Sequence, residues 1–266
     1  MKVLIFWDIY GRIWRKAFLK EFSSLVDAYA PDFIVVNVDN ISSGRGIIME
    51  HARLLIEKWV DVLTGWDHIF DNFSDIEEYM NSEKCRLLRP ANFPHSIPWK
   101  GYTIVEKDGK KLGVIHLLGN IFMNHQWENP FLVADRILEE LQREKVQAVV
   151  MDFHREASSE LYGMAFYLDG RISAVFWTHT HIQTNDAHIL PWGTALITDI
   201  GMNGPHHSVI WADFSSVKKR FLTGIQKWKI QQSLSNEYVI SALSLEIDEF
   251  TGKTLSCIPI RFLWIL

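Results

Sequence analysis

Five short apolar runs in this chain are each followed, within a few residues, by side chains that can bind a metal ion. The runs at 2–6, 33–37, 60–64, 148–152 and 172–176 have the length of buried strands. The polar residues that follow them are Asp8, Asp39, Asn40, Asp67, His68, His154, His179 and His181. An α/β sheet presents its ligands at the carboxyl ends of its strands. The sequence therefore predicts an α/β fold with one site at that edge.

Helical and strand patterns alternate along the chain. Helices are expected at 15–29, 49–58, 73–81 and 131–144, and further strands at 194–200 and 209–212. Two hairpins are expected around the turns at 107–110 and 250–253. The β-α-β-α-β order of the first third is typical of a parallel sheet. Together, these patterns predict a layered α/β sandwich.

Length and composition limit the class of protein. The chain has 266 residues, 48% of them hydrophobic, and no linker divides it, so residues 1–266 are expected to form a single domain. A net charge of -5 gives no reason to expect non-specific nucleic-acid binding. Cys85 and Cys257 are too few for a disulfide framework. Without a signal-like start or a run of about 18 apolar residues, a cytoplasmic protein that does not span a membrane is expected.

The candidate ligands are oxygen and imidazole groups with no thiolate among them. Such sets suit Fe, Mn, Zn or Co better than Ca or Mg. His179 and His181 are two residues apart, so at a strand end they can reach two neighbouring ions. Taken singly, His154 also fits a core histidine and Asp8 a helix cap. It is the whole set at five strand ends that favours a site with two metal ions.

Eight ordered segments also match a known family. They are Asp8-Ile-Tyr-Gly-Arg12, Asn37-Val-Asp-Asn40, Asp67-His68, Arg89-Pro-Ala-Asn92, Asp152-Phe-His154, Tyr167-Leu-Asp-Gly-Arg171, Thr178-His-Thr-His-Ile-Gln-Thr184 and Ile197-Thr-Asp-Ile-Gly-Met202. Across nearly its whole length the chain resembles the calcineurin-like metallophosphoesterases of the YmdB type. The resemblance implies a four-layer α/β/β/α sandwich and hydrolysis of 2′,3′-cyclic nucleotides to 3′-nucleotides, an activity linked to RNA metabolism.

The resemblance also implies a role for each candidate ligand. Asp8, Asn40 and His181 would hold one metal ion, Asp67, His154 and His179 would hold the other, and Asp39 would bridge them. The family usually has glutamate at the position of Asp39 and asparagine at that of Asp67. Both replacements keep an oxygen ligand, so we expect the site to survive. Iron and manganese are the metals that the resemblance favours, and the substrate-binding residues stay unassigned.

The implied reaction is attack on phosphorus by a hydroxide that bridges the two ions. His68 would act as general acid and protonate the departing ribose oxygen. The substrate would be a small cyclic nucleotide or the phosphoester at an RNA end. The alternative from another class is a non-catalytic regulator or binding protein of RNA metabolism that keeps the fold. The sequence leaves open whether the chain acts alone or as a homo-oligomer.

The chain holds 11 tryptophans and only 15 glycines. Trp7 and Trp66 each directly precede a candidate ligand, and Trp177 lies two residues before His179. The resemblance leads us to expect glycine there, and also at Trp14, Trp59, Trp99 and Trp192, which are expected in turns. One hypothesis is that UGA codons for glycine have been translated as tryptophan, which would raise glycine to about 10% against a usual ~7%. An inactive product would then be expected. The alternative is a genuinely tryptophan-rich protein.

Two further segments are open to more than one interpretation. The loop 42–46, Ser-Ser-Gly-Arg-Gly, lacks the P-loop pattern and is expected to be a flexible loop beside the site rather than a phosphate cradle. Asp152 and Glu156 flank His154, but no Ser-His-Asp order supports a serine hydrolase.

Overall fold

The computed structural model describes residues 1–66, 68–94, 96–97, 99–124, 126–225, 227 and 229–265. It contains two mixed sheets. The first has the order β11-β12-β1-β2-β3-β4, with β13 paired to β12. Its strands are β1 (Lys2–Phe6), β2 (Phe33–Asn37), β3 (Val62–Thr64), β4 (Leu87–Leu88), β11 (Gly204–Pro205), β12 (Glu237–Ile247) and β13 (Thr254–Ile265). The strands β1 to β4 run parallel to one another, as the alternating pattern predicts.

The second sheet has the order β5-β6-β7-β8-β10-β9. Its strands are β5 (Tyr102–Lys107), β6 (Lys110–Leu118), β7 (Ala148–His154), β8 (Ala174–Phe176), β9 (His188–Ile189) and β10 (Ala195–Ile197). The four inner strands β6, β7, β8 and β10 are parallel. Both expected hairpins form, one from β5 and β6 and the other from β12 and β13.

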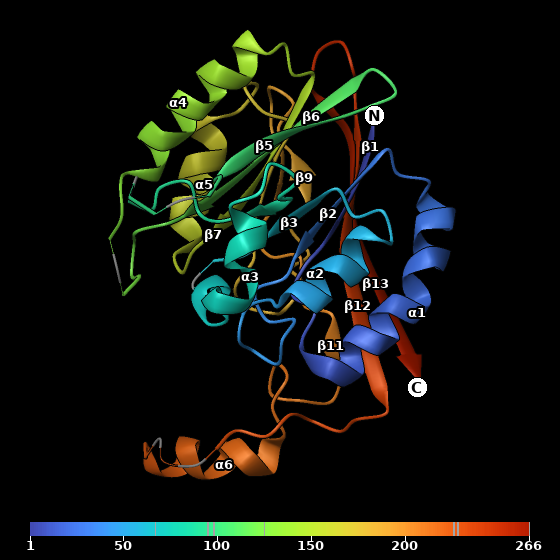
Figure 1. Cartoon of the computed structure of the whole chain (residues 1–266), viewed down its shortest axis with the longest axis vertical. Helices are drawn as coiled ribbons and strands as arrows, with labels where there is room; N and C mark the ends of the chain where they lie inside the picture. Colours follow the sequence, from blue (N-terminus) through green and yellow to red (C-terminus); the bar gives the residue numbers. More distant parts are fainter. Residues whose placement is uncertain are drawn as a thin grey trace.

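Helices cover the outer face of each sheet (Figure 1). The first sheet is covered by α1 (Gly11–Tyr29), α2 (Met49–Ile56) and α3 (Phe73–Met80), and the second by α4 (Pro130–Arg143) and α5 (Ser158–Tyr167). The orange helix α6 (Phe214–Thr223) projects away from both sheets at the lower end of the view. Lys218 and Lys219 on it are exposed. None of the described helices combines the length and apolarity that crossing a bilayer requires.

Three buried cores join these layers. Because side chains alternate along a strand, Leu4 and Phe6 of β1 pack under the first helices, whereas Val3 and Ile5 face the second sheet. The middle core contains side chains of both sheets, and the third joins the second sheet to α4 and α5. This arrangement confirms the expected four-layer α/β/β/α sandwich.

Three local expectations were wrong. The first helix begins at Gly11 rather than at residue 15, so Trp14 lies inside a helix and not in a turn. The run 209–212 is a tight turn rather than a strand, because Ile210 adopts a φ of 58° and Val209 and Ala212 hydrogen-bond to each other. The strand β7 continues through His154 instead of ending before it. Helix α5, which the sequence pattern did not indicate, follows shortly afterwards.

Candidate metal centre

The carboxyl ends of parallel strands from both sheets meet around one pocket. Asp8 follows β1, Asp39 and Asn40 follow β2, His154 ends β7, and the two later histidines follow β8. The pocket has a volume of about 210 Å³. Its lining includes five of the predicted site residues, namely Asn40, His68, His154, His179 and His181. The structure therefore gathers residues more than a hundred positions apart in the sequence.

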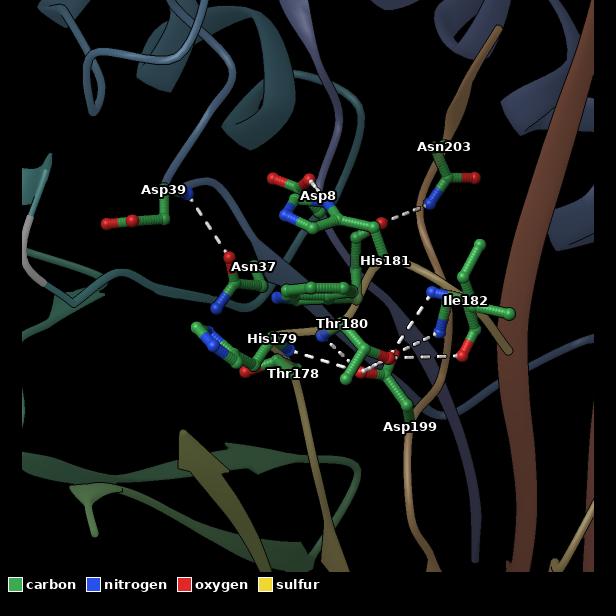
Figure 2. A network of polar contacts seen from close by, with 12 residues as sticks. Asp8, Asn37, Asp39, Thr178, His179, Thr180, His181, Ile182, Asp199 and Asn203 are labelled. Carbon is green, nitrogen blue, oxygen red and sulfur yellow. Dashed lines mark hydrogen bonds and ion pairs between the residues drawn. The ribbon is translucent and has the colours of Figure 1, made fainter. Parts of the chain in front are cut away.

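Asp8 and His181 form the first close pair of donors. Asp8 Oδ2 lies 2.5 Å from His181 Nδ1, and the two side chains lie together in Figure 2. Both residues adopt left-handed backbone conformations, with φ values of 47° and 66°. Such strain in non-glycine residues is concentrated at functional sites. Burial favours the neutral form of His181, but the nearby Asp8 carboxylate outweighs it and raises the pKa of the imidazole.

His154 and His179 form the second pair. His154 Nε2 lies 3.0 Å from His179 Nδ1, and the other nitrogen of His179 lies 2.6 Å from Glu156. His154 is fully buried, and burial together with the neighbouring His179 lowers its pKa well below the ordinary value. A neutral imidazole keeps the lone pair that metal binding requires.

The spacing within one pair matches that of metal ligands. Ligands that hold one ion at about 2.0–2.2 Å lie about 3 Å apart when they are neighbours in its coordination shell. His154 and His179 have this separation, 3.0 Å, whereas the 2.5 Å between Asp8 and His181 is the length of a direct ion pair. Apart from the contact with His181, no described residue donates a hydrogen bond to the buried Asp8 carboxylate. A buried carboxylate without donors suits a cation, so the residues present fit the implied ions.

The remaining predicted residues take different positions. Asp39 Oδ1 accepts a hydrogen bond of 2.7 Å from the Trp66 main chain, and in Figure 2 its carboxylate points away from Asp8 and His181. Its bridging role stays a prediction. His68 lies in a short 3₁₀ helix, with Nδ1 2.9 Å from Asp71 Oδ2. Asp67 lies outside the described residues.

The buried carboxylate of Asp152 supports the pair of His154 and His179 through hydrogen bonds to neighbouring side chains. Asp152 accepts hydrogen bonds from Asn37 at 3.0 Å, Thr64 at 2.6 Å and Thr178 at 2.8 Å. The Thr178 hydroxyl also lies 3.2 Å from His154 Nδ1. Asp152 thus ties the ends of β2, β3 and β7 together and orients a candidate ligand through Thr178. The sequence had indicated no role for Asp152, although it falls in a matched segment.

Asp199 plays a similar part for the loop between the two later histidines. Its Oδ2 accepts hydrogen bonds of 2.7 Å from the Thr180 main chain and hydroxyl, and one of 3.3 Å from the His179 main chain (Figure 2). Burial raises the pKa of Asp199 to about 6, against these hydrogen bonds. Asp199 was also missed, since a lone aspartate in a matched segment does not reveal what its carboxylate contacts.

The comparisons with known proteins agree with this geometry. The family model described as YmdB-like protein matches residues 4–260. The chain belongs to the YmdB-like family. It is 36% identical over 259 residues to the 2′,3′-cyclic-nucleotide 2′-phosphodiesterase of Bacillus subtilis (strain 168), covering 96% of this chain and 94% of the relative. The family expected from the sequence is confirmed.

Solved structures support the same placement. A crystal structure described as a novel phosphatase from Mycoplasma pneumoniae has a TM-score of 0.89 and 28% identity, covering 99% of this chain and 93% of that one. A putative 5′-nucleotidase from Staphylococcus aureus, at 14% identity and a TM-score of 0.60, shares the fold over 97% of this chain and 53% of its own. The predictions of a metallophosphoesterase-type fold and of an enzyme of the phosphodiesterase or phosphatase class are confirmed at this level.

Proposed function

We propose that this YmdB-like chain is a two-metal phosphodiesterase that hydrolyses 2′,3′-cyclic nucleotides, or the cyclic phosphate at an RNA end, to the 3′-phosphate. The observation that carries the proposal is the presence of two donor pairs, Asp8 with His181 and His154 with His179, beside one pocket that all three histidines line. The name of the Bacillus subtilis relative supports the choice of substrate.

We assign the ligands as the family resemblance suggests. Asp8, Asn40 and His181 would hold one ion and His154, His179 and Asp67 the other, with Asp39 between them. The donor set contains imidazole, carboxylate and amide groups without thiolate, which suits iron or manganese. When bound, such ions lower the pKa of water and neutralise charge on the phosphoryl oxygens.

His68 is assigned as the proton donor to the departing ribose oxygen. Its Nδ1 lies 2.9 Å from Asp71 Oδ2 and the residue lines the pocket, and we assign the proton transfer to its Nε2 atom. A carboxylate on one nitrogen fixes the tautomer and the orientation of an imidazole ring. A positioned acid of this kind is suited to a leaving group that would otherwise depart as an alkoxide.

Arg45 is assigned to the substrate phosphate. It is the one lysine or arginine among the residues that line the pocket in the described part of the chain. Ser43 and Gly44 of the same loop also line the pocket, which agrees with the expected position of the 42–46 loop beside the site. A guanidinium group can make paired hydrogen bonds to phosphate oxygens.

The test is product analysis with defined metal. The protein purified from its source cells, or a recombinant chain with the same sequence as that protein, is loaded with Mn²⁺ or Fe²⁺ and given 2′,3′-cyclic AMP, and chromatography separates the 3′- and 2′-nucleotides. We expect the 3′-nucleotide, loss of turnover on chelation, and unchanged turnover in His188→Ala, whose imidazole lies outside the pocket lining. A chain that binds no metal and turns over no cyclic nucleotide would instead support the non-catalytic regulator.

A further inference from the structure

Two tryptophans occupy backbone conformations that favour glycine. Among the described residues other than glycine, the two largest positive φ values belong to Trp99, at 86°, and Trp59, at 68°. The glycines with positive φ span 61° to 105°. A side chain with a Cβ atom is disfavoured in this region, whereas glycine adopts it without strain.

Trp59 is the clearer of the two. Its main-chain N–H bonds to Ile56 O at 3.0 Å, and Val60 N bonds to Leu55 O at 3.2 Å, which is the hydrogen-bond pattern that ends a helix at a left-handed residue. Gly224 ends α6 in the same conformation, with a φ of 70°. The Trp59 side chain is 74% exposed, so burial does not offset the strain.

Three other indoles crowd the candidate ligands. The Trp66 ring stacks on His154 with 3.7 Å between centroids and lies 5.9 Å from the ring of His179. The Trp7 ring lies 4.9 Å from that of His181, and the Trp177 ring lies 6.1 Å from that of His179. Each imidazole that we assign to a metal therefore contacts an indole.

Two of these indoles are also poorly accommodated. Trp7 and Trp177 are buried, and no described residue accepts a hydrogen bond from either indole N–H. Arg155 is fully buried with its guanidinium 3.8 Å from the Trp177 ring, and none of its three nitrogens has an acceptor in the described part of the chain. The guanidinium and the ring make a cation–π contact, which is favourable. The N–H groups of Arg155 and of the indole nevertheless stay without acceptors, and buried donors without partners destabilise a fold.

We propose that positions 7, 59, 66, 99 and 177 carry glycine in the protein that the source cell makes, because the cell reads the codon UGA as glycine. A single difference in how one codon is read would put tryptophan in place of glycine at all five positions at once. Independent glycine-to-tryptophan mutations would each need their own compensating change. The proposal rests in part on the proposed function, since the crowding concerns the metal site. The backbone argument at positions 59 and 99 does not depend on it.

Peptide mass spectrometry of the protein from its source cells is the direct test. Cleavage after Lys58 and Lys84 gives a peptide, 59–84, that contains two of the positions, and cleavage after Lys2 and Arg12 gives one that contains position 7. We expect masses with glycine and UGA codons in the gene. Tryptophan masses, or UGG at these positions, would overturn the proposal.

Recombinant variants test the physical argument separately. We expect Trp59→Gly to have a Tm about 2–8 °C above that of Trp59→Ala, because only glycine relieves the left-handed conformation. Equal Tm values would contradict the backbone argument. At position 66 we expect Trp66→Gly and Trp66→Ala to bind more Mn²⁺ than the chain with tryptophan, and Trp66→Phe, which keeps a ring, to bind no more.

These experiments distinguish the two proposals. Glycine in the source peptides, together with a glycine-containing chain that binds no metal and hydrolyses nothing, would refute the phosphodiesterase while the glycine assignment stands. Tryptophan in the source peptides, together with efficient hydrolysis, would do the opposite.

Discussion

The two halves of the pocket come from different sheets and are held in different ways. The imidazoles at the end of β7 and after β8 are held by side chains, chiefly through Asp152 and Asp199. On the first sheet the main chain does this work, as the Asp8 carbonyl accepts a hydrogen bond of 2.9 Å from Asn203 and the Asp39 carbonyl one of 2.8 Å from Gly46. We call the side with His154, His179 and His181 the nitrogen half and the side with Asp8, Asp39 and Asn40 the oxygen half. Side-chain hydrogen bonds preorganise the nitrogen half. In the oxygen half the hydrogen bonds fix the backbone, and the Asp39 carboxylate bonds to the Trp66 main chain.

The strongest test of this difference removes one ligand from each half. We expect His154→Ala to lose metal and to reduce hydrolysis to the rate without protein, because a buried donor from the preorganised half is gone. For Asn40→Ala, on the oxygen half, we expect the initial rate of hydrolysis to fall about 10–100-fold. Metal analysis and initial rates on 2′,3′-cyclic AMP check both. A greater loss in Asn40→Ala would break the comparison.

His68 lines the same pocket and should affect only the chemical step. We expect His68→Ala to keep its metal content but to lose about 10²–10⁴-fold in kcat, the usual contribution of a general acid. The loss should be smaller for a substrate with a good leaving group, such as a nitrophenyl ester. An equal loss for both substrates would argue against the assigned proton transfer.

Asp152 tests whether side-chain support matters to the nitrogen half. We expect Asp152→Asn to weaken metal affinity about 10–100-fold, because it disturbs the threonine that contacts His154. Asp27→Asn, an exposed aspartate on α1, is the matched control and should bind metal normally. Metal titration monitored by calorimetry gives the two affinities, and identical values would contradict the supporting role.

An effect of the same size is expected at Arg45, on the oxygen side of the pocket. Loss of a charged hydrogen bond to phosphate costs about 1.5–3 kcal/mol, so KM should rise roughly 10–100-fold in Arg45→Ala. Arg45→Lys should recover part of this loss, because it keeps the charge but not the paired hydrogen bonds. An unchanged KM in Arg45→Ala would remove Arg45 from substrate binding.

The strand ends were predictable, but the contacts between them were not. The apolar runs before Asp8, Asp39 and His154 indicated buried parallel strands, and the carboxyl ends of such strands must share an edge. Sequence periodicity cannot show that Asp152 bonds to three different strand ends, since that depends on tertiary packing. It also missed α5, because its apolar residues occur all around the helix instead of on one face.

Backbone conformation was the other source of error. The apolar run 209–212 resembles a strand, yet Ile210 turns the chain at a positive φ that its residue type does not suggest. Conversely, Trp59 was expected in a turn, and the structure places it at a left-handed helix end. Local propensity therefore located the site but not the strain around it.

The central claim is that two ions lie where the two halves meet. The most direct measurement is an anomalous difference map from crystals of the source-cell protein grown with Mn²⁺. The account predicts two peaks, one bound by Asp8 and His181 and one by His154 and His179. A map with no peak at these residues, from crystals in which Mn²⁺ is bound elsewhere, would contradict it.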